Sequence, residues 1–153
     1  GRLADLQRGG GMCYAEKLLI SKQDQLSPMH THVIKAEDII NRGGATMGVE
    51  LYGSDTDGNF AEDRGGAVMC DGIAREFQAG EKLKFAPGES LTLMPGDWHA
   101  FWGEGGDVLI GEVSTVNDDN TDNIFRDPIG RFAQIEEDVA PTHLLVSDYA
   151  KWL

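Results

Sequence analysis

The chain has 153 residues, enough for one domain to bury a hydrophobic core without disulfide support. Its 26 acidic residues outnumber its 13 Lys and Arg residues, so the formal net charge is −13. A surface of this sign repels polyanions, so we expect neither nucleic acid nor an anionic membrane as a partner. No apolar run approaches the roughly 18 residues that a membrane span needs, and nothing resembles a signal peptide. We therefore expect a soluble, cytoplasmic protein.

Short strand-like runs separated by tight turns fill the chain up to Ser114. In chain order, the pattern predicts strands at residues 12–21, 29–33, 46–52, 67–70, 74–78, 81–85, 90–94 and 108–114. Turn signals lie between many of them, at Arg42-Gly43-Gly44, Asp71-Gly72, Ala79-Gly80 and Pro87-Gly88. Short strands at this spacing are typical of an all-β sandwich or barrel.

The pattern changes after Thr115. Residues 116–131 are rich in acidic side chains and poor in apolar ones, and we expect them to wrap the mouth of the barrel. The tail, residues 143–153, has an apolar run that could add a last strand. With no repeat and no internal linker, residues 1–153 are expected to form a single domain. Residues 1–11 are interpreted as either a tag remnant or a shortened N-terminal segment.

Four residues form the strongest chemical signal. His30 and His32 are two apart, so on a strand their side chains point to the same face. Glu37 follows five residues later, and His99 comes after the turn sequence Pro95-Gly96-Asp97. A lone pair of histidines at this spacing is often no more than two surface residues, but the added Glu37 and His99 favour a metal site. Three imidazoles and one carboxylate suit a divalent first-row metal and leave two neighbouring positions open.

The spacing of these residues resembles the two cupin motifs. The first reads His-x-His-x4-Glu-x6-Gly and ends at Gly44, and the second reads Gly-x6-Pro-Gly-x2-His and ends at His99. Asp24 stands where the first motif usually begins with Gly, and the second motif is one residue longer than usual. Both departures affect turns and not the ligands. The resemblance implies a cupin, a double-stranded β-helix or jelly-roll barrel.

Further runs of sequence carry a more specific resemblance. They are residues 14–18, 28–32, 35–44, 111–114, 116–119, 121–123, 130–132 and 135–138. They resemble the D-lyxose ketol-isomerase family, and the similarity extends from about residue 12 to the C-terminus. Members often carry an additional N-terminal segment. The resemblance implies an aldose–ketose isomerase, usually manganese-dependent, that interconverts D-lyxose with D-xylulose and often D-mannose with D-fructose.

Candidate catalytic and sugar-binding residues follow from the same comparison. Lys17 matches the family's active-site lysine, although the strand pattern alone is equally consistent with an exposed lysine. Glu112 ends an apolar strand; pointing inward it is the best general-base candidate, and pointing outward it is an ordinary surface residue. Asp118, Asp119 and Arg131 lie in the loop-rich region that matches the family, where they either contact sugar hydroxyls or form a solvated acidic loop.

The expected cofactor is one divalent metal ion, most readily Mn²⁺, with Co²⁺, Fe²⁺, Ni²⁺ and Zn²⁺ as alternatives. The expected partners are a small-molecule sugar and a second copy of the chain, because barrel edges and flat outer sheet faces invite pairing into a homodimer. Three other functions stay open: a cupin oxygenase, a sugar-phosphate isomerase and a non-catalytic sugar-binding cupin. The acidic residues in 115–123 disfavour the phosphate isomerase, which needs a basic cluster.

Overall fold

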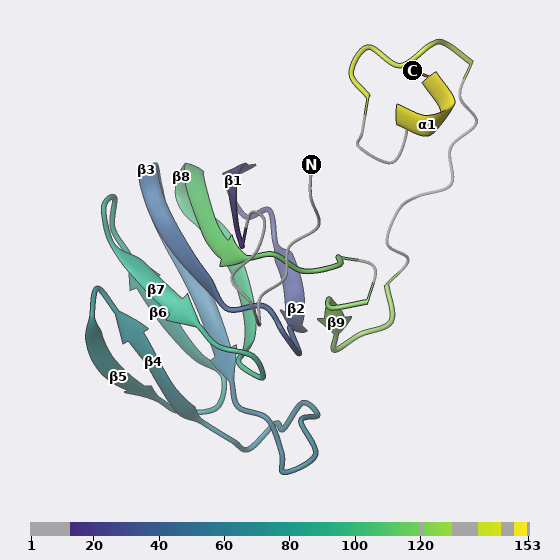
Figure 1. The fold of residues 1–153 in the computed structure, drawn as a ribbon. Coiled ribbons are helices and arrows are strands. Elements are labelled where there is room, and N and C mark those ends of the chain that lie inside the picture. The colour runs from purple at the N-terminus through teal and green to yellow at the C-terminus, as the bar shows by residue number, and fades with distance from the viewer. Residues whose placement is uncertain (1–12, 120, 130–137, 145–148, 153) are drawn as a thin grey trace.

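The structure is a computed structural model that describes residues 13–119, 121–129, 138–144 and 149–152. Nearly all of its regular elements are antiparallel strands, and one short helix, α1 (Tyr149–Trp152), lies apart from them (Figure 1). The strands are β1 (Tyr14–Ser21), β2 (Ser27–Thr31), β3 (Glu37–Tyr52), β4 (Gly66–Cys70), β5 (Ile73–Phe77), β6 (Glu81–Phe85), β7 (Ser90–Leu93), β8 (Trp98–Thr115) and β9 (Ile124–Phe125). The expected all-β cupin fold is confirmed.

Two long strands, β3 and β8, run through both sheets of the barrel. The first part of β3 and the last part of β8 pair with each other and with β7 and β1, giving the order β5-β4-β7-β3-β8-β1. The last part of β3 and the first part of β8 form the second sheet, in the order β6-β3-β8-β2-β9. Because the same two strands belong to both sheets, residues of both sheets pack into the larger of two hydrophobic clusters.

The sequence Arg42-Gly43-Gly44 does not form the predicted turn. It is a bend inside β3, where the register with β8 shifts between Asn41 and Gly43 and again between Gly44 and Thr46. Gly44 has a φ of +96°, and a Cβ on it would lie 2.3 Å from the carbonyl oxygen of Asp107 on β8. Glycine signals a turn and a bulge equally well, so the predicted strands 46–52 and 108–114 are the ends of longer bent strands.

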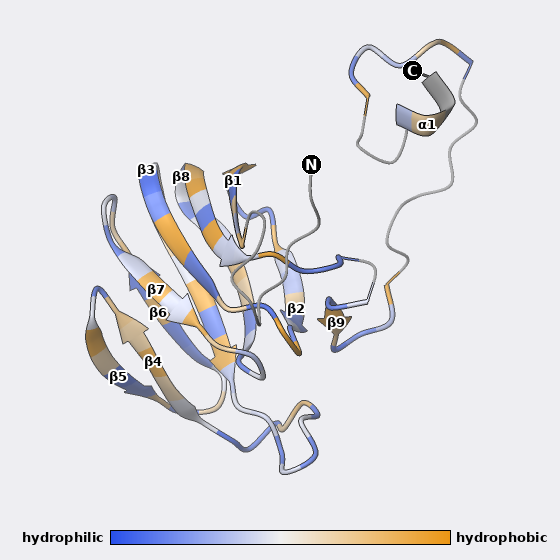
Figure 2. Cartoon of the chain, viewed as in Figure 1, coloured by the Kyte–Doolittle hydropathy of each residue, from blue (hydrophilic) through white to orange (hydrophobic). Residues whose placement is uncertain are grey.

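The core lies between the two sheets. Hydropathy alternates along β3 and β8 in Figure 2, as expected for strands with one face inward. The least exposed large side chains are Ile39, Met47, Leu51, Leu83, Leu91, Leu93 and Ile110. Asn41 is also fully buried, and its amide donates to the carbonyls of Ala45 and Phe85 while its Oδ1 accepts from the Gly43 N–H. These bonds fix the bend of β3.

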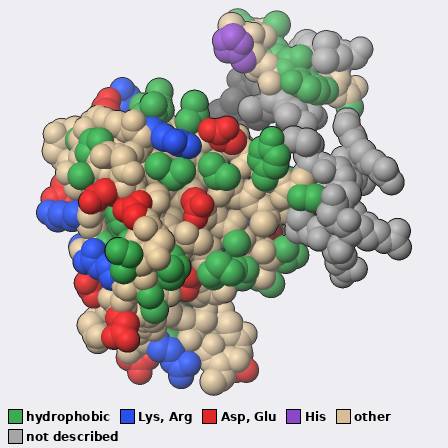
Figure 3. Space-filling model, turned by 60° about the vertical axis from the view of Figure 1, so that its left-hand side comes forward, with side chains coloured by type: hydrophobic (Ala, Val, Ile, Leu, Met, Phe, Trp, Pro, Cys, Tyr) green, Lys and Arg blue, Asp and Glu red, His purple; other side chains and the backbone are tan. Residues whose placement is uncertain are grey.

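The apolar run predicted to add a last strand, residues 143–146, lies partly outside the described residues, as do residues 1–11. Residues 149–152, which follow it, form α1. In the described part of the chain, no helical segment meets the length and hydropathy that a membrane span requires. On the face seen in Figure 3, Lys and Arg side chains lie in small separate groups with acidic side chains close by.

The bend of β3 gives a test of the fold. Gly44 and Gly88 both have a φ of +96°, but no atom lies within 4 Å of a Cβ built on Gly88. Both Ala variants lose about 1–3 kcal/mol from the positive φ. Gly44→Ala additionally forces a Cβ against the β8 backbone, so we expect it to lose about 1–3 kcal/mol more. Urea unfolding of the two variants measures the difference, and equal losses would contradict the close β3–β8 approach.

Candidate active site

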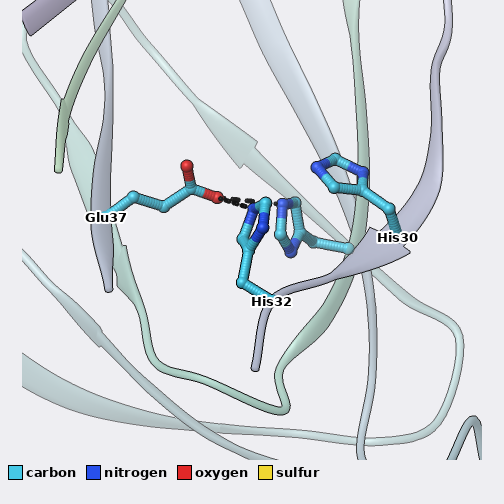
Figure 4. A group of neighbouring side chains, drawn as sticks. His30, His32 and Glu37 are labelled. Carbon is cyan, nitrogen blue, oxygen red and sulfur yellow. Dashed lines mark ion pairs between the residues drawn. The ribbon is translucent and has the colours of Figure 1, made fainter. Parts of the chain in front are cut away.

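Four potential ligands come together where β2 ends and where β3 and β8 begin. His30 lies on β2 opposite His99 on β8, and His32 follows just beyond the end of β2. Glu37 is the first residue of β3. One ligand atom from each of these four residues lies within 4.8 Å of the other three. Figure 4 shows the imidazoles of His30 and His32 and the carboxylate of Glu37 turned toward a common region.

The three imidazoles are oriented by the backbone through their Nδ1 atoms. Nδ1 lies 2.7 Å from the Pro28 carbonyl in His30 and 3.0 Å from the Asp97 carbonyl in His99. In His32 it lies 2.8 Å from the carbonyl of Asp122. A carbonyl can only accept, so each Nδ1 carries a proton, and in the neutral form of the ring Nε2 keeps a free lone pair. Burial lowers the pKa of His30 to about 3, with a further contribution from His99, so this ring is neutral near pH 7.

The potential ligand atoms of the cluster cannot form hydrogen bonds with one another. Glu37 Oε1 lies 3.2 Å from His32 Nε2 and 3.1 Å from His99 Nε2. All three atoms are buried without a hydrogen-bond partner among the described residues. Two lone-pair nitrogens and a carboxylate oxygen are all acceptors in this tautomer, so they need a cation between them. The chemistry of these ligand atoms therefore fits a divalent metal ion.

A network of buried charges extends from this cluster. Lys35 is 4% exposed, and its Nζ lies 2.6 Å from Glu37 Oε2 and 2.9 Å from Glu112 Oε1. Burial lowers the pKa of Lys35, but Glu37 and then Glu112 raise it by more, so the ammonium stays charged. Burial raises the pKa of Glu37, yet this pKa stays below the usual range, and the charge of Lys35 beside Oε2 contributes to the lowering.

Glu112 and Lys17 meet at the same place. They are cross-strand neighbours on β8 and β1, and Lys17 Nζ lies 3.1 Å from Glu112 Oε1. Glu112 is 7% exposed, so of the two orientations open from the sequence, the inward one is found. Lys17 remains partly exposed and also lies 3.9 Å from Asp119. Both candidate catalytic residues therefore belong to the network of charges that begins at Glu37.

Lys35, Glu37 and Glu112 line a pocket of about 240 Å³. Its walls are Leu19, Ser27, Pro28, His30, His32, Lys35, Glu37, Phe101, Glu112, Asp119, Asn123, Phe125 and Ile129. Asp119 is thus placed at the pocket, whereas Asp118 is exposed and its carbonyl accepts the N–H groups of Thr121 and Asp122. Arg131 lies outside the described residues.

Sequence reasoning missed several residues of the site. Lys35 is the most important, and it lies in the irregular loop between β2 and β3, where strand alternation gives no signal. Asn123 and Phe125 line the pocket from a segment without clear periodicity. Asp122 is buried and accepts three backbone N–H groups. Burial raises its pKa, but those three hydrogen bonds lower it by more.

The fold and the cluster together define a cupin with a largely buried cluster of three histidines and one carboxylate. A family model described as D-lyxose isomerase matches residues 1–149, and the chain belongs to this family. The chain is 50% identical over 142 residues to a D-lyxose/D-mannose isomerase of Serratia proteamaculans. It is 45% identical over 142 residues to a protein of the same name from Escherichia coli O157:H7.

Both alignments cover 92% of this chain but 62% of the relative, so the chain spans less than two thirds of their length. Among solved structures, an L-ribose isomerase of Acinetobacter sp. DL28, in complex with L-ribose, has a TM-score of 0.55 at 20% identity. That match covers 74% of this chain and 59% of the other. It supports the fold.

The position of Lys35 leads to a stability prediction. Lys35→Met removes the cation between two buried carboxylates, so we expect the metal-free protein to lose about 3–5 kcal/mol. Lys22→Met is the matched control, because it breaks an ion pair with Asp107 whose two side chains are 69% and 51% exposed. Because solvent screens that exposed pair, its loss is expected to change stability far less. Urea unfolding in the presence of a chelator measures both, and similar losses would argue against a charged, buried Lys35.

Proposed function

We propose that this chain is a metal-dependent aldose–ketose isomerase that interconverts D-lyxose and D-xylulose, and also D-mannose and D-fructose. The observation that carries the proposal is one pocket that holds three of the candidate metal ligands and a buried carboxylate, Glu112. Lys35 contacts both Glu112 and the candidate ligand Glu37. Family membership and the names of relatives at 45–50% identity support the reaction and the sugars.

His30, His32, Glu37 and His99 are the residues that would hold the metal. Mn²⁺ is the proposed ion, since a set of three nitrogens and one oxygen in six-fold geometry suits it, with Co²⁺, Fe²⁺, Ni²⁺ or Zn²⁺ as substitutes. When bound, such an ion polarises the carbonyl of the sugar and the adjacent hydroxyl. The cluster faces the pocket through His30, His32 and Glu37, so the reacting end of the sugar is expected to lie there.

Glu112 is the proposed base. Conversion of an aldose to a ketose takes a proton from carbon 2 and returns one to carbon 1, while the hydroxyl proton passes from oxygen 2 to oxygen 1. Among the described residues, both Lys17 and Lys35 contact Oε1 of Glu112. Its other oxygen, Oε2, is then the atom that accepts the carbon-bound proton and returns it.

The two lysines have different proposed roles. Lys35 is buried between Glu37 and Glu112 and fixes the distance between the cluster and the base. Lys17 is more exposed and lies between Glu112 and Asp119, where it can stabilise negative charge that develops on the sugar oxygens. Asp119 at the pocket is proposed to bind a sugar hydroxyl, and the same role is proposed for Asp118 and Arg131.

An activity assay separates this function from a non-catalytic sugar-binding cupin. Glu112→Gln preserves the shape of the side chain but cannot accept the proton, so turnover of D-lyxose should fall by about 100-fold or more. Affinity for Mn²⁺ and for the sugar should change little. Glu104→Gln is the control, since Glu104 is on the same strand, outside the pocket, and pairs with Lys84. His32→Ala should lose metal and turnover together.

Product formation is followed by chromatography after incubation of each protein with D-lyxose, D-mannose or D-fructose and Mn²⁺. If Glu112→Gln turns over normally, the base lies elsewhere, with Asp118 and Asp119 next to test. If the unsubstituted protein binds a sugar but converts none, the non-catalytic function replaces the proposed one. Oxygen consumption would favour a cupin oxygenase, and a requirement for a phosphorylated sugar would favour a sugar-phosphate isomerase.

A homodimer is proposed for the assembly. The outward face of β1 exposes Tyr14, Leu18 and Ile20 by 60%, 66% and 68%, with the exposed Glu16 between the first two, and a second copy can cover these apolar side chains. Light scattering is expected to give twice the 16.6 kDa of the chain. Leu18→Glu should shift the mass toward one chain, and a monomer mass for the unsubstituted protein at all concentrations would refute the dimer.

A further inference from the structure

Asp122, between β8 and β9, holds the loop that joins His32 to Glu37. The residue is 2% exposed, and its Oδ1 accepts hydrogen bonds from the N–H groups of Val33 and Ile34, at 2.8 and 2.9 Å. Its Oδ2 accepts from the N–H of Lys35 at 3.0 Å. One carboxylate therefore satisfies three consecutive backbone donors of a loop that has no strand partner of its own.

The main chain of Asp122 orients one of the candidate metal ligands, His32. The Asp122 carbonyl accepts the hydrogen bond from Nδ1 of His32 at 2.8 Å. That bond sets the plane of the imidazole and the direction of its Nε2 lone pair. A single residue thus positions two others. The carbonyl of Asp122 orients the His32 ring, and its side chain holds the backbone from which the Lys35 side chain begins.

Asp122 also fixes the segment that closes the pocket. Its N–H donates to the carbonyl of Asp118 at 2.9 Å, which closes a turn. Asp119 lies in this turn and Asn123 follows directly, and both line the pocket. The segment that would contact the sugar is therefore anchored to the loop that carries Lys35.

We propose that Asp122 is a positioning residue that aligns His32 and Lys35 with each other and with the sugar-facing segment. The inference rests on the proposed function. A residue that only anchors a loop would affect stability alone. A residue that sets the direction of an imidazole also affects how strongly a metal is bound and with what geometry, because orienting partners of ligating histidines typically contribute about 10–100-fold in affinity.

The test is Asp122→Asn, which keeps the size of the side chain but turns an NH₂ group toward one of the three N–H donors. Asp127→Asn is the matched control, since Asp127 is exposed and pairs with its neighbour Arg126. Co²⁺ is titrated into each metal-free protein without sugar, and its visible absorption reports both affinity and ligand geometry. We expect the dissociation constant to rise about 10–100-fold and the spectrum to shift in Asp122→Asn, with neither change in the control.

With saturating Mn²⁺, the same variant should lower kcat for D-lyxose, because Lys35 is displaced from Glu112. An Asp122→Asn protein with a lower melting temperature but unchanged Co²⁺ affinity and spectrum would overturn the inference. If that variant does not fold, Asp122→Ser, which keeps one acceptor, is held to the same outcomes. Failure of the unsubstituted protein to bind Co²⁺ would overturn the proposed function and this inference together, whereas an unchanged variant overturns this inference alone.

Discussion

Lys35 places a positive charge inside the barrel between two carboxylates, 2.6 Å from Glu37 and 2.9 Å from Glu112. Each carboxylate would be costly to bury alone, and the shared ammonium makes both tolerable. Glu37 belongs to the cluster with His32 and His99, whereas Glu112 faces the pocket beside Lys17. The separation between cluster and candidate base is therefore determined by one side chain. The aliphatic part of that side chain is buried too, so it has little freedom to move.

The bent strands explain how groups so far apart in the sequence reach this point. Glu37 begins β3, and His99 and Glu112 lie near opposite ends of β8. In a straight strand of that length, residues near the two ends would lie far apart in the plane of one sheet. The glycine bends let each strand pass from one sheet to the other, so both ends of β8 face the same interior. Asn41 holds the bend from inside through its three hydrogen bonds.

The sequence predicted the members of the cluster better than their surroundings. His30 and His32 could be placed together because strand alternation is regular, and motif spacing added Glu37 and His99. Periodicity cannot tell the inward face from the outward one, so the direction of Glu112 stayed open until burial showed it. Lys35 sits in an irregular loop, where no period applies, and its orientation depends on Asp122, many residues later. Gly43 and Gly44 predict a turn but form a bend, because the pairing with β8 decides between the two and the glycines allow both.

The pairing of β3 with β8 also determines when the cluster can form as the chain folds. His30, His32 and Glu37 are close in the sequence, but His99 arrives only when β8 has paired with β2 and β3. Pairings such as Tyr14 with Thr115 and Glu37 with Ser114 span most of the described chain, and contacts of such long range form slowly. Full affinity for a cation is thus a property of the closed barrel. A bound cation then adds its binding free energy to the native state alone and slows the opening of β8.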